Sequence, residues 1–130
     1  MKRDQSYFLL LNIGHLLDHL FTLIFATVAA LVLYRDWGIG YAELLVYATP
    51  GFFAFGLFSL PAGWLGDRWS RSGMIAVFFI GIGASSILPG FASTPAEIAG
   101  GLTLIGIFAS IYHPVGISMV VEGREKVGKL

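Results

Sequence analysis

Three ionisable side chains lie close together inside an apolar segment: His15, Asp18 and His19. The two histidines are four residues apart, so on a helix they lie one turn apart on the same face. Imidazole titrates near neutral pH, and a carboxylate one turn away changes that titration. The spacing therefore predicts a group that takes up and releases protons.

The same string, His-x-x-Asp-His, is similar to the inverted zincin pattern His-x-x-Glu-His, in which two histidines bind zinc. Two features argue against that chemistry here. The shorter Asp18 replaces the glutamate, and the sequence shows no clear further ligand for a metal. We therefore expect no metal site, no cofactor and no enzymatic activity.

Asn12 and Thr22 extend this group into a polar stripe. At 100° per residue the five side chains fall within about 120° of arc on a helix. A charge at the centre of a bilayer costs at least about 2.5–3.5 kcal/mol, so the stripe should face a bundle interior or a water-filled cavity. For Asn12 and Thr22 we expect hydrogen bonds to neighbouring helices, and Asn12 also lies on the predicted pathway.

The composition places these residues in a membrane. Of 130 residues, 56% are hydrophobic and only 12% are charged, whereas soluble domains have about a quarter charged. Four apolar segments approach or exceed the ~20 residues that a helix needs to cross a bilayer. Helices are the expected spanning form, because lipid offers no partners to backbone amides. We predict an all-α integral membrane protein with helices over about 7–34, 44–65, 74–91 and 96–121, and a cytoplasmic tail over 122–130.

Basic residues indicate the orientation of the chain. Of the eight lysines and arginines, only Arg35 lies in the first or third loop. The positive-inside rule therefore predicts cytoplasmic termini, and we expect a bacterial inner membrane. The first segment is too long and too polar for a cleaved signal peptide. Zero net charge argues against a nucleic-acid partner.

Prolines interrupt two of the expected helices, and Pro50 and Pro114 are the predicted kinks. Tyr112 and His113 directly precede Pro114, at a depth where irregular backbone must pack in protein or line a cavity. His15 and His113 lie equally far from the inner ends of their segments, about 12 Å inside the cytoplasmic boundary. We expect them to line one aqueous pathway with Tyr112, Asp18 and the other histidine.

A short charged turn joins the second and third segments. It resembles the signature Gly-x-Leu-Ala-Asp-Arg-x-Gly-Arg-Lys of the major facilitator superfamily of transporters. The residues that match are Gly63, Leu65, Asp67, Arg68 and Arg71. Gly66 stands where alanine is usual, and Ser70 and Ser72 replace a glycine and a lysine, which weakens the basic end.

The resemblance implies a secondary transporter of twelve helices in two six-helix halves that rock around a central site. It implies that this chain holds four helices of the N-terminal bundle and that the remaining helices are missing from it. The signature turn would form the cytoplasmic gate. Expected partners are the lipid bilayer, a small-molecule substrate and protons.

Several functions stay open. Many proton-coupled drug exporters of the family carry an arginine in helix four, whereas His113-Pro114 occupies the polar part of this one. Proton-coupled drug antiport and metabolite uptake both fit. An alternative is a small four-helix multidrug exporter that acts as a dimer, with Asp18 as its membrane carboxylate. Exporters of that class lack the signature turn. A third is a non-transporting scaffold subunit whose polar stripe binds partner helices.

Overall fold

The computed structural model describes the backbone of residues 3–127 and the side chains of residues 5–123. The first segment is one continuous helical span made of α1 (Arg3–Val28), the π-helical η1 (Ala29–Leu33) and α2 (Tyr34–Asp36). Gly38, with a φ of 64°, reverses the chain after it. The expected cytoplasmic residues Lys2 and Lys129 lie outside the described residues.

The second segment is divided into α3 (Tyr41–Val46) and α4 (Thr49–Arg68). Pro50 lies in the first turn of α4, where a missing N–H is tolerated. The expected kink at Pro50 is therefore a helix start after a short turn. Within α4, Pro61 is tolerated inside the helix.

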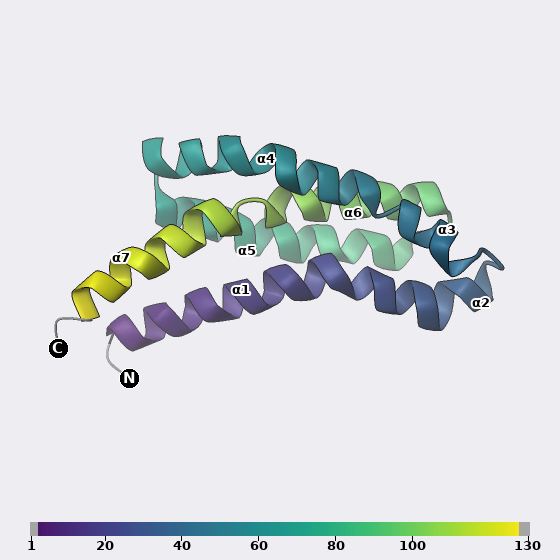
Figure 1. Cartoon of the computed structure of the whole chain (residues 1–130), viewed down its shortest axis with the longest axis horizontal. Coiled ribbons are helices and arrows are strands. Elements are labelled where there is room, and N and C mark those ends of the chain that lie inside the picture. The colour runs from purple at the N-terminus through teal and green to yellow at the C-terminus, as the bar shows by residue number, and fades with distance from the viewer. Residues whose placement is uncertain (1–2, 128–130) are drawn as a thin grey trace.

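The third segment comprises α5 (Arg71–Ile87) and the 3-10 helix η2 (Leu88–Phe91). Ser70 caps α5, because its hydroxyl accepts a hydrogen bond from the backbone N–H of Gly73 at 3.0 Å. The turn between α4 and α5 is short, so the two helices run antiparallel (Figure 1).

The fourth segment is divided into α6 (Pro95–Ala109), the π-helical η3 (Tyr112–Gly116) and α7 (Ile117–Val127). Thr94 and Glu97 form the capping box that begins α6. After the turn at 110–111 the axis changes direction, and α7 diverges from α6 toward the start of α1 (Figure 1). The fourth helix is therefore broken in the part that carries His113 and Pro114.

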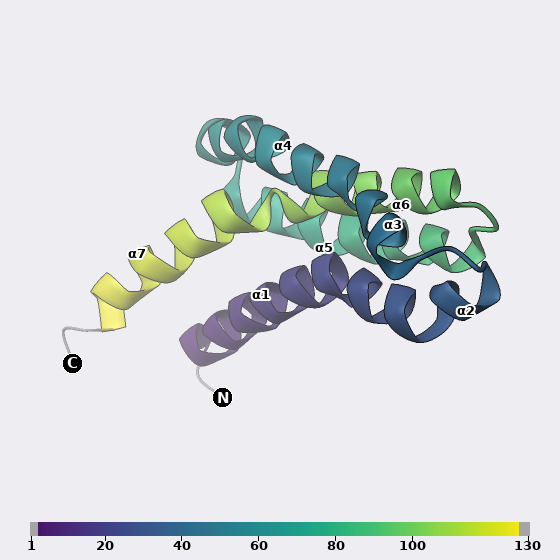
Figure 2. The same ribbon diagram turned by 45° about the vertical axis from the view of Figure 1, so that its right-hand side comes forward.

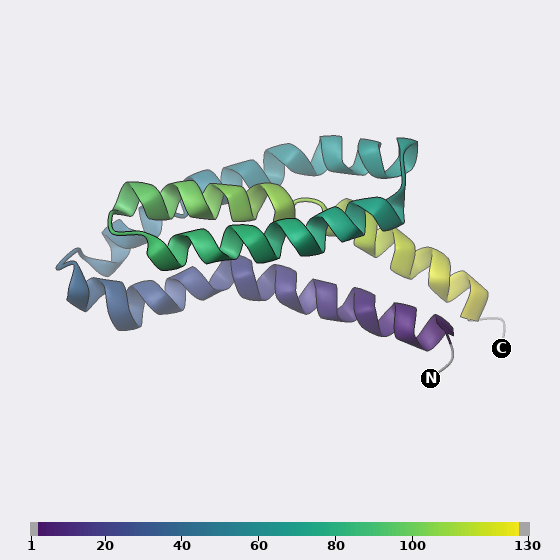
Figure 3. The same ribbon diagram turned by 180° about the vertical axis from the view of Figure 1, so that it is seen from behind.

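The helices form one bundle. Seen from behind, α6 lies between α4 and α5, and α1 runs beneath them (Figure 3), where it contacts both α5 and α6. The start of α1, the end of α7 and the turn between α4 and α5 lie at one end of the bundle (Figure 1), and the connections from α2 to α3 and from η2 to α6 lie at the other. A view turned by 45° keeps this arrangement (Figure 2).

Small residues set the closest helix contact. A Cβ atom on Gly51 of α4 would lie 2.7 Å from the carbonyl oxygen of Leu102, and a Cβ on Gly106 would overlap the carbonyl of Gly51. Both glycines therefore allow the backbones of α4 and α6 to touch. By contrast, Leu60 and Phe91 are 82% and 81% exposed, as expected for side chains that face lipid.

Candidate functional site

The structure brings Asp18 of α1 against His113 of η3, two residues far apart in the sequence. Nε2 of His113 lies 3.2 Å from Oδ2 of Asp18. The Asp18 side chain is 1% exposed, and its Oδ1 has no hydrogen-bond partner among the described residues. A carboxylate is therefore buried with one oxygen beside an imidazole and the other unsatisfied.

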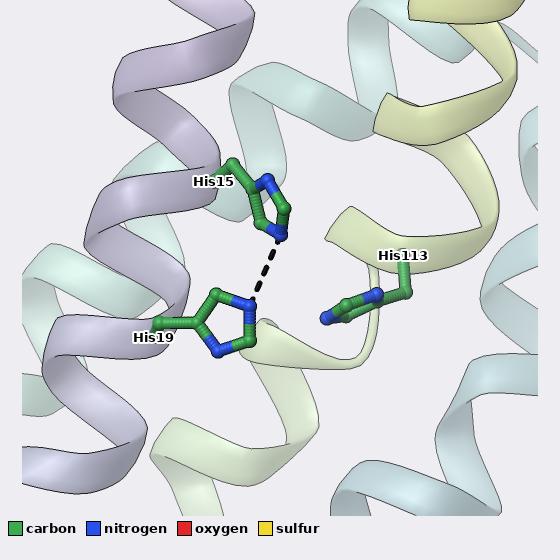
Figure 4. Close-up of side chains that lie close together, drawn as sticks. All are labelled: His15, His19 and His113. Atoms are coloured by element: carbon green, nitrogen blue, oxygen red, sulfur yellow. Dashed lines mark hydrogen bonds between the residues drawn. The ribbon is translucent and has the colours of Figure 1, made fainter.

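His15 and His19 complete the cluster from α1. Their Nε2 atoms lie 3.0 Å apart, and the ring centroid of His113 lies 5.8 Å from that of His15 and 5.7 Å from that of His19. Figure 4 shows the three rings pointing toward one another across the space between α1 and η3. These are all the histidines of the chain. We call them, together with Asp18, the polar cluster.

Tyr112 anchors η3 to α1. Its hydroxyl donates a hydrogen bond to the carbonyl of Leu11, and its ring stacks on that of His15 at 5.3 Å. A Cβ atom on Gly14 or on Gly116 would lie 2.8 Å from the Tyr112 ring. Because these glycines have no side chain, they leave space for the Tyr112 ring. This role of the two glycines was not predicted from the sequence.

The helix break gives His113 its position. Pro114 has no N–H, and the next backbone bond runs from Val115 N–H to the carbonyl of Ile111 at 3.3 Å. The Ser110 hydroxyl donates a hydrogen bond to the carbonyl oxygen of Ile107 at 2.6 Å. The break therefore places the side chains of Tyr112 and His113 against α1. The His113 ring also lies edge-on to the ring of Phe55, with the centroids 5.5 Å apart.

Asn12 and Thr22 differ from expectation. The Asn12 amide donates to the carbonyl of Phe8 at 2.7 Å, and the Thr22 hydroxyl donates to the carbonyl of Asp18 at 2.8 Å. Both bonds stay within α1, because a short polar side chain reaches the carbonyl one turn back more easily than another helix. The expectation that these two residues hydrogen-bond between helices was wrong.

The signature turn carries a second charged group at the end of the bundle. Nη2 of Arg71 lies 2.8 Å from Oδ1 of Asp67, and Nη1 of the same arginine contacts Glu122 of α7. The Arg68 guanidinium lies over the Trp64 ring at 5.3 Å. Glu122 was not among the predicted residues, since only the divergence of α7 brings it to the turn.

Two glycines near the end of α4, Gly63 and Gly66, lie against the helix break. A Cβ atom on Gly63 would lie 3.1 Å from Cβ of Pro114, and one on Gly66 would lie 2.9 Å from Cγ2 of Val115. The inner end of α4 thus packs directly on η3. A movement of the turn would therefore shift the backbone that carries His113.

Four described helical spans are long and apolar enough to cross a membrane, and an ionisable cluster lies between two of them, as in an integral membrane protein. The chain belongs to the Major Facilitator Superfamily, whose family profile matches residues 11–125. No curated protein and no solved structure matched the chain. The family and the all-α membrane fold predicted from the sequence are confirmed.

Proposed function

We propose that the protein couples the transport of a small molecule to protons and that Asp18 and His113 bind the coupling proton. The observation that carries this proposal is the buried carboxylate with one oxygen 3.2 Å from an imidazole and one oxygen without a partner. Ionisable groups at membrane depth are rare, and they commonly serve as proton relays or substrate sites. The family supplies the transport activity, and the cluster supplies the coupling.

The pair can take two states. With Asp18 charged and His113 protonated, the 3.2 Å contact is an ion pair between α1 and η3. A proton that moves onto the carboxylate leaves both groups neutral and removes that attraction. Because η3 is the broken part of the fourth segment, α1 and η3 can then separate at little cost in backbone hydrogen bonds.

Protons can reach the pair through the exposed side of the cluster. His15 and His19 are both exposed, and the His113 side chain is 34% exposed, whereas Asp18 is buried behind them. We propose that this side faces an aqueous cavity completed by further helices of the protein. The imidazoles would pass protons between that cavity and Asp18.

We propose that the signature turn is the gate, with Gly63, Leu65, Asp67, Arg68 and Arg71 as its residues. The contacts of Arg71 with Asp67 and Glu122 tie the α4–α5 turn to α7. This end of the bundle would face the cytoplasm of a bacterial inner membrane, as the basic residues predict. Breaking the contacts with Arg71 would then favour the state open to the cytoplasm.

The experiment is an Asp18→Asn substitution in the full-length protein, reconstituted in vesicles. The readouts are ethidium transport driven by an imposed pH gradient and the infrared band of a protonated carboxyl group. We expect the variant to lose the gradient-driven component of transport and the titrating carboxyl band. Asp36→Asn, which alters an exposed acid at the other end of the bundle, should keep both.

Two results would contradict the proposal. One is gradient-driven transport by Asp18→Asn at the rate of the unmodified protein. The other is a titrating carboxyl band that persists in Asp18→Asn, which would place the coupling proton elsewhere.

A further inference from the structure

We infer that the three histidines form a binding site for one divalent transition-metal ion of the zinc type, with Asp18 as the adjacent carboxylate. From the sequence we expected no metal site, because Asp18 replaces the glutamate of the zincin pattern and no clear further ligand was visible. The structure supplies the third imidazole from η3, with one ring nitrogen of each histidine within 4.8 Å of the others.

The separations suit a zinc-sized ion. Nitrogen ligands lie about 2.0–2.1 Å from zinc, so two of them in a tetrahedral site are about 3.3 Å apart. Nε2 of His15 and Nε2 of His19 are 3.0 Å apart already, one helical turn from each other. Only the more distant His113 needs to approach, and its partly exposed ring can rotate.

The pair of Nε2 atoms also gains from a cation. Two imidazole nitrogens at 3.0 Å are held together only when one carries a hydrogen and the other does not. Two unprotonated nitrogens at this distance would repel each other. A metal ion between them accepts both lone pairs, so it converts an arrangement that depends on one tautomer into a stable chelate.

Asp18 supplies a negative charge beside the site, which stabilises a bound dication. Its Oδ2 contacts His113, and a carboxylate bonded to a metal-binding histidine orients the ring and raises its basicity. Its Oδ1 has no partner among the described residues, so the charge on that oxygen is available to balance a nearby cation. Three imidazoles and one carboxylate favour Zn²⁺, Co²⁺, Ni²⁺ or Cu²⁺ over Mg²⁺ and Ca²⁺, which prefer all-oxygen sites.

The site overlaps the proposed proton site, but it does not depend on proton coupling. Metal binding requires neutral imidazoles and therefore competes with protons at the same nitrogens. Asp18→Asn separates the two ideas. It should abolish the coupled transport described above, yet it leaves the three imidazoles and hence a weakened metal site.

The experiment uses Co²⁺ as a coloured probe on the full-length protein, purified without a histidine tag. We expect one equivalent of Co²⁺ to bind with the visible absorption of a tetrahedral site, to be displaced by Zn²⁺ and to be unaffected by excess Mg²⁺. His113→Gln should weaken Co²⁺ binding by at least about tenfold, since even a lost supporting contact costs 10–100-fold. Ser6→Ala, at an exposed residue of α1 outside the cluster, should bind normally.

His19→Gln gives an independent check, because His19 is exposed and its substitution should disturb the packing of the helices little. Tryptophan fluorescence and gel filtration would establish that each variant is folded. The inference is overturned if the unmodified protein shows no saturable Co²⁺ absorption, or if His113→Gln and His19→Gln both bind as tightly as the unmodified protein.

Discussion

The polar cluster and the signature turn both hold ionisable groups between helices, but they differ in exposure and in the kind of charge they use. In the cluster, Asp18 is 1% exposed and its partners are histidines, which can be neutral. At the turn, the side chains of Asp67, Arg71 and Glu122 are 68%, 32% and 61% exposed, and two carboxylates contact a guanidinium. The two regions are joined by the contact of Gly66 with Val115.

The difference follows from the cost of desolvation. A buried ion pair must offset the loss of water around both groups, so side chains that can neutralise each other by moving a proton are favoured. Exposed ion pairs have no such cost, and water and salt weaken them. We infer that the protonation of the cluster changes during transport. The ion pairs at the turn keep their charges, and a conformational change makes or breaks them.

The largest expected contrast comes from the same isosteric change in each region. Asp18→Asn should lose gradient-driven transport, because the carboxylate that binds the proton is gone. Asp67→Asn should keep proton coupling but shift the balance between the inward-open and outward-open states. Parallel measurement of ethidium transport and of the accessibility of the two faces to thiol reagents would check this. Loss of coupling in both variants would remove the distinction.

Packing between the two regions should be the next most sensitive feature. Gly66→Val would force a side chain onto Val115, and we expect a loss of about 1–3 kcal/mol of stability from overpacking. Gly56→Val is the matched control in the same helix, because nothing lies within 4 Å of a Cβ atom there. Thermal unfolding of both variants in detergent measures the difference, and equal melting temperatures would show that α4 does not press on η3.

Tyr112→Phe tests the anchor of the cluster. The substitution removes one buried hydrogen bond to the carbonyl of Leu11 and should cost about 0.5–1.5 kcal/mol. Tyr34→Phe, at an exposed tyrosine, should change the unfolding temperature less. If Tyr112→Phe also left coupled transport intact, Tyr112 would position His15 and not carry protons itself.

The smallest effect is expected at the turn. Glu122→Gln removes the exposed contact with Arg71, so it should lower the unfolding temperature only slightly, and less in high salt than in low salt. Melting curves at two salt concentrations would measure it. A large decrease that salt does not reduce would mean that this contact is buried in the full-length protein and belongs with the cluster.

Local patterns in the sequence predicted the helical spans and much of the cluster. The period of a helix places His15, Asp18 and His19 on one face. The equal distance of His15 and His113 from the inner ends of their predicted segments suggested that they lie in one layer, and their ring centroids are 5.8 Å apart.

Features that depend on tertiary packing were not predictable in the same way. The divergence of α7, which brings Glu122 to Arg71, follows from the break at 110–111 and from what packs on it. The space that Gly14 and Gly116 leave for Tyr112 requires knowing that α1 and η3 are neighbours. Asn12 and Thr22 bond within α1 because the nearest acceptor is local, a competition that polarity alone does not decide.

The most direct test is the reaction of His113→Cys with a membrane-impermeant thiol reagent in the full-length protein. The 130 residues contain no cysteine, and Leu60→Cys, at a side chain expected to face lipid, serves as the control. If the cluster lines a water-filled pathway, His113→Cys reacts and Leu60→Cys does not. If His113→Cys is as unreactive as Leu60→Cys in every condition, then water does not reach the cluster and the account is wrong.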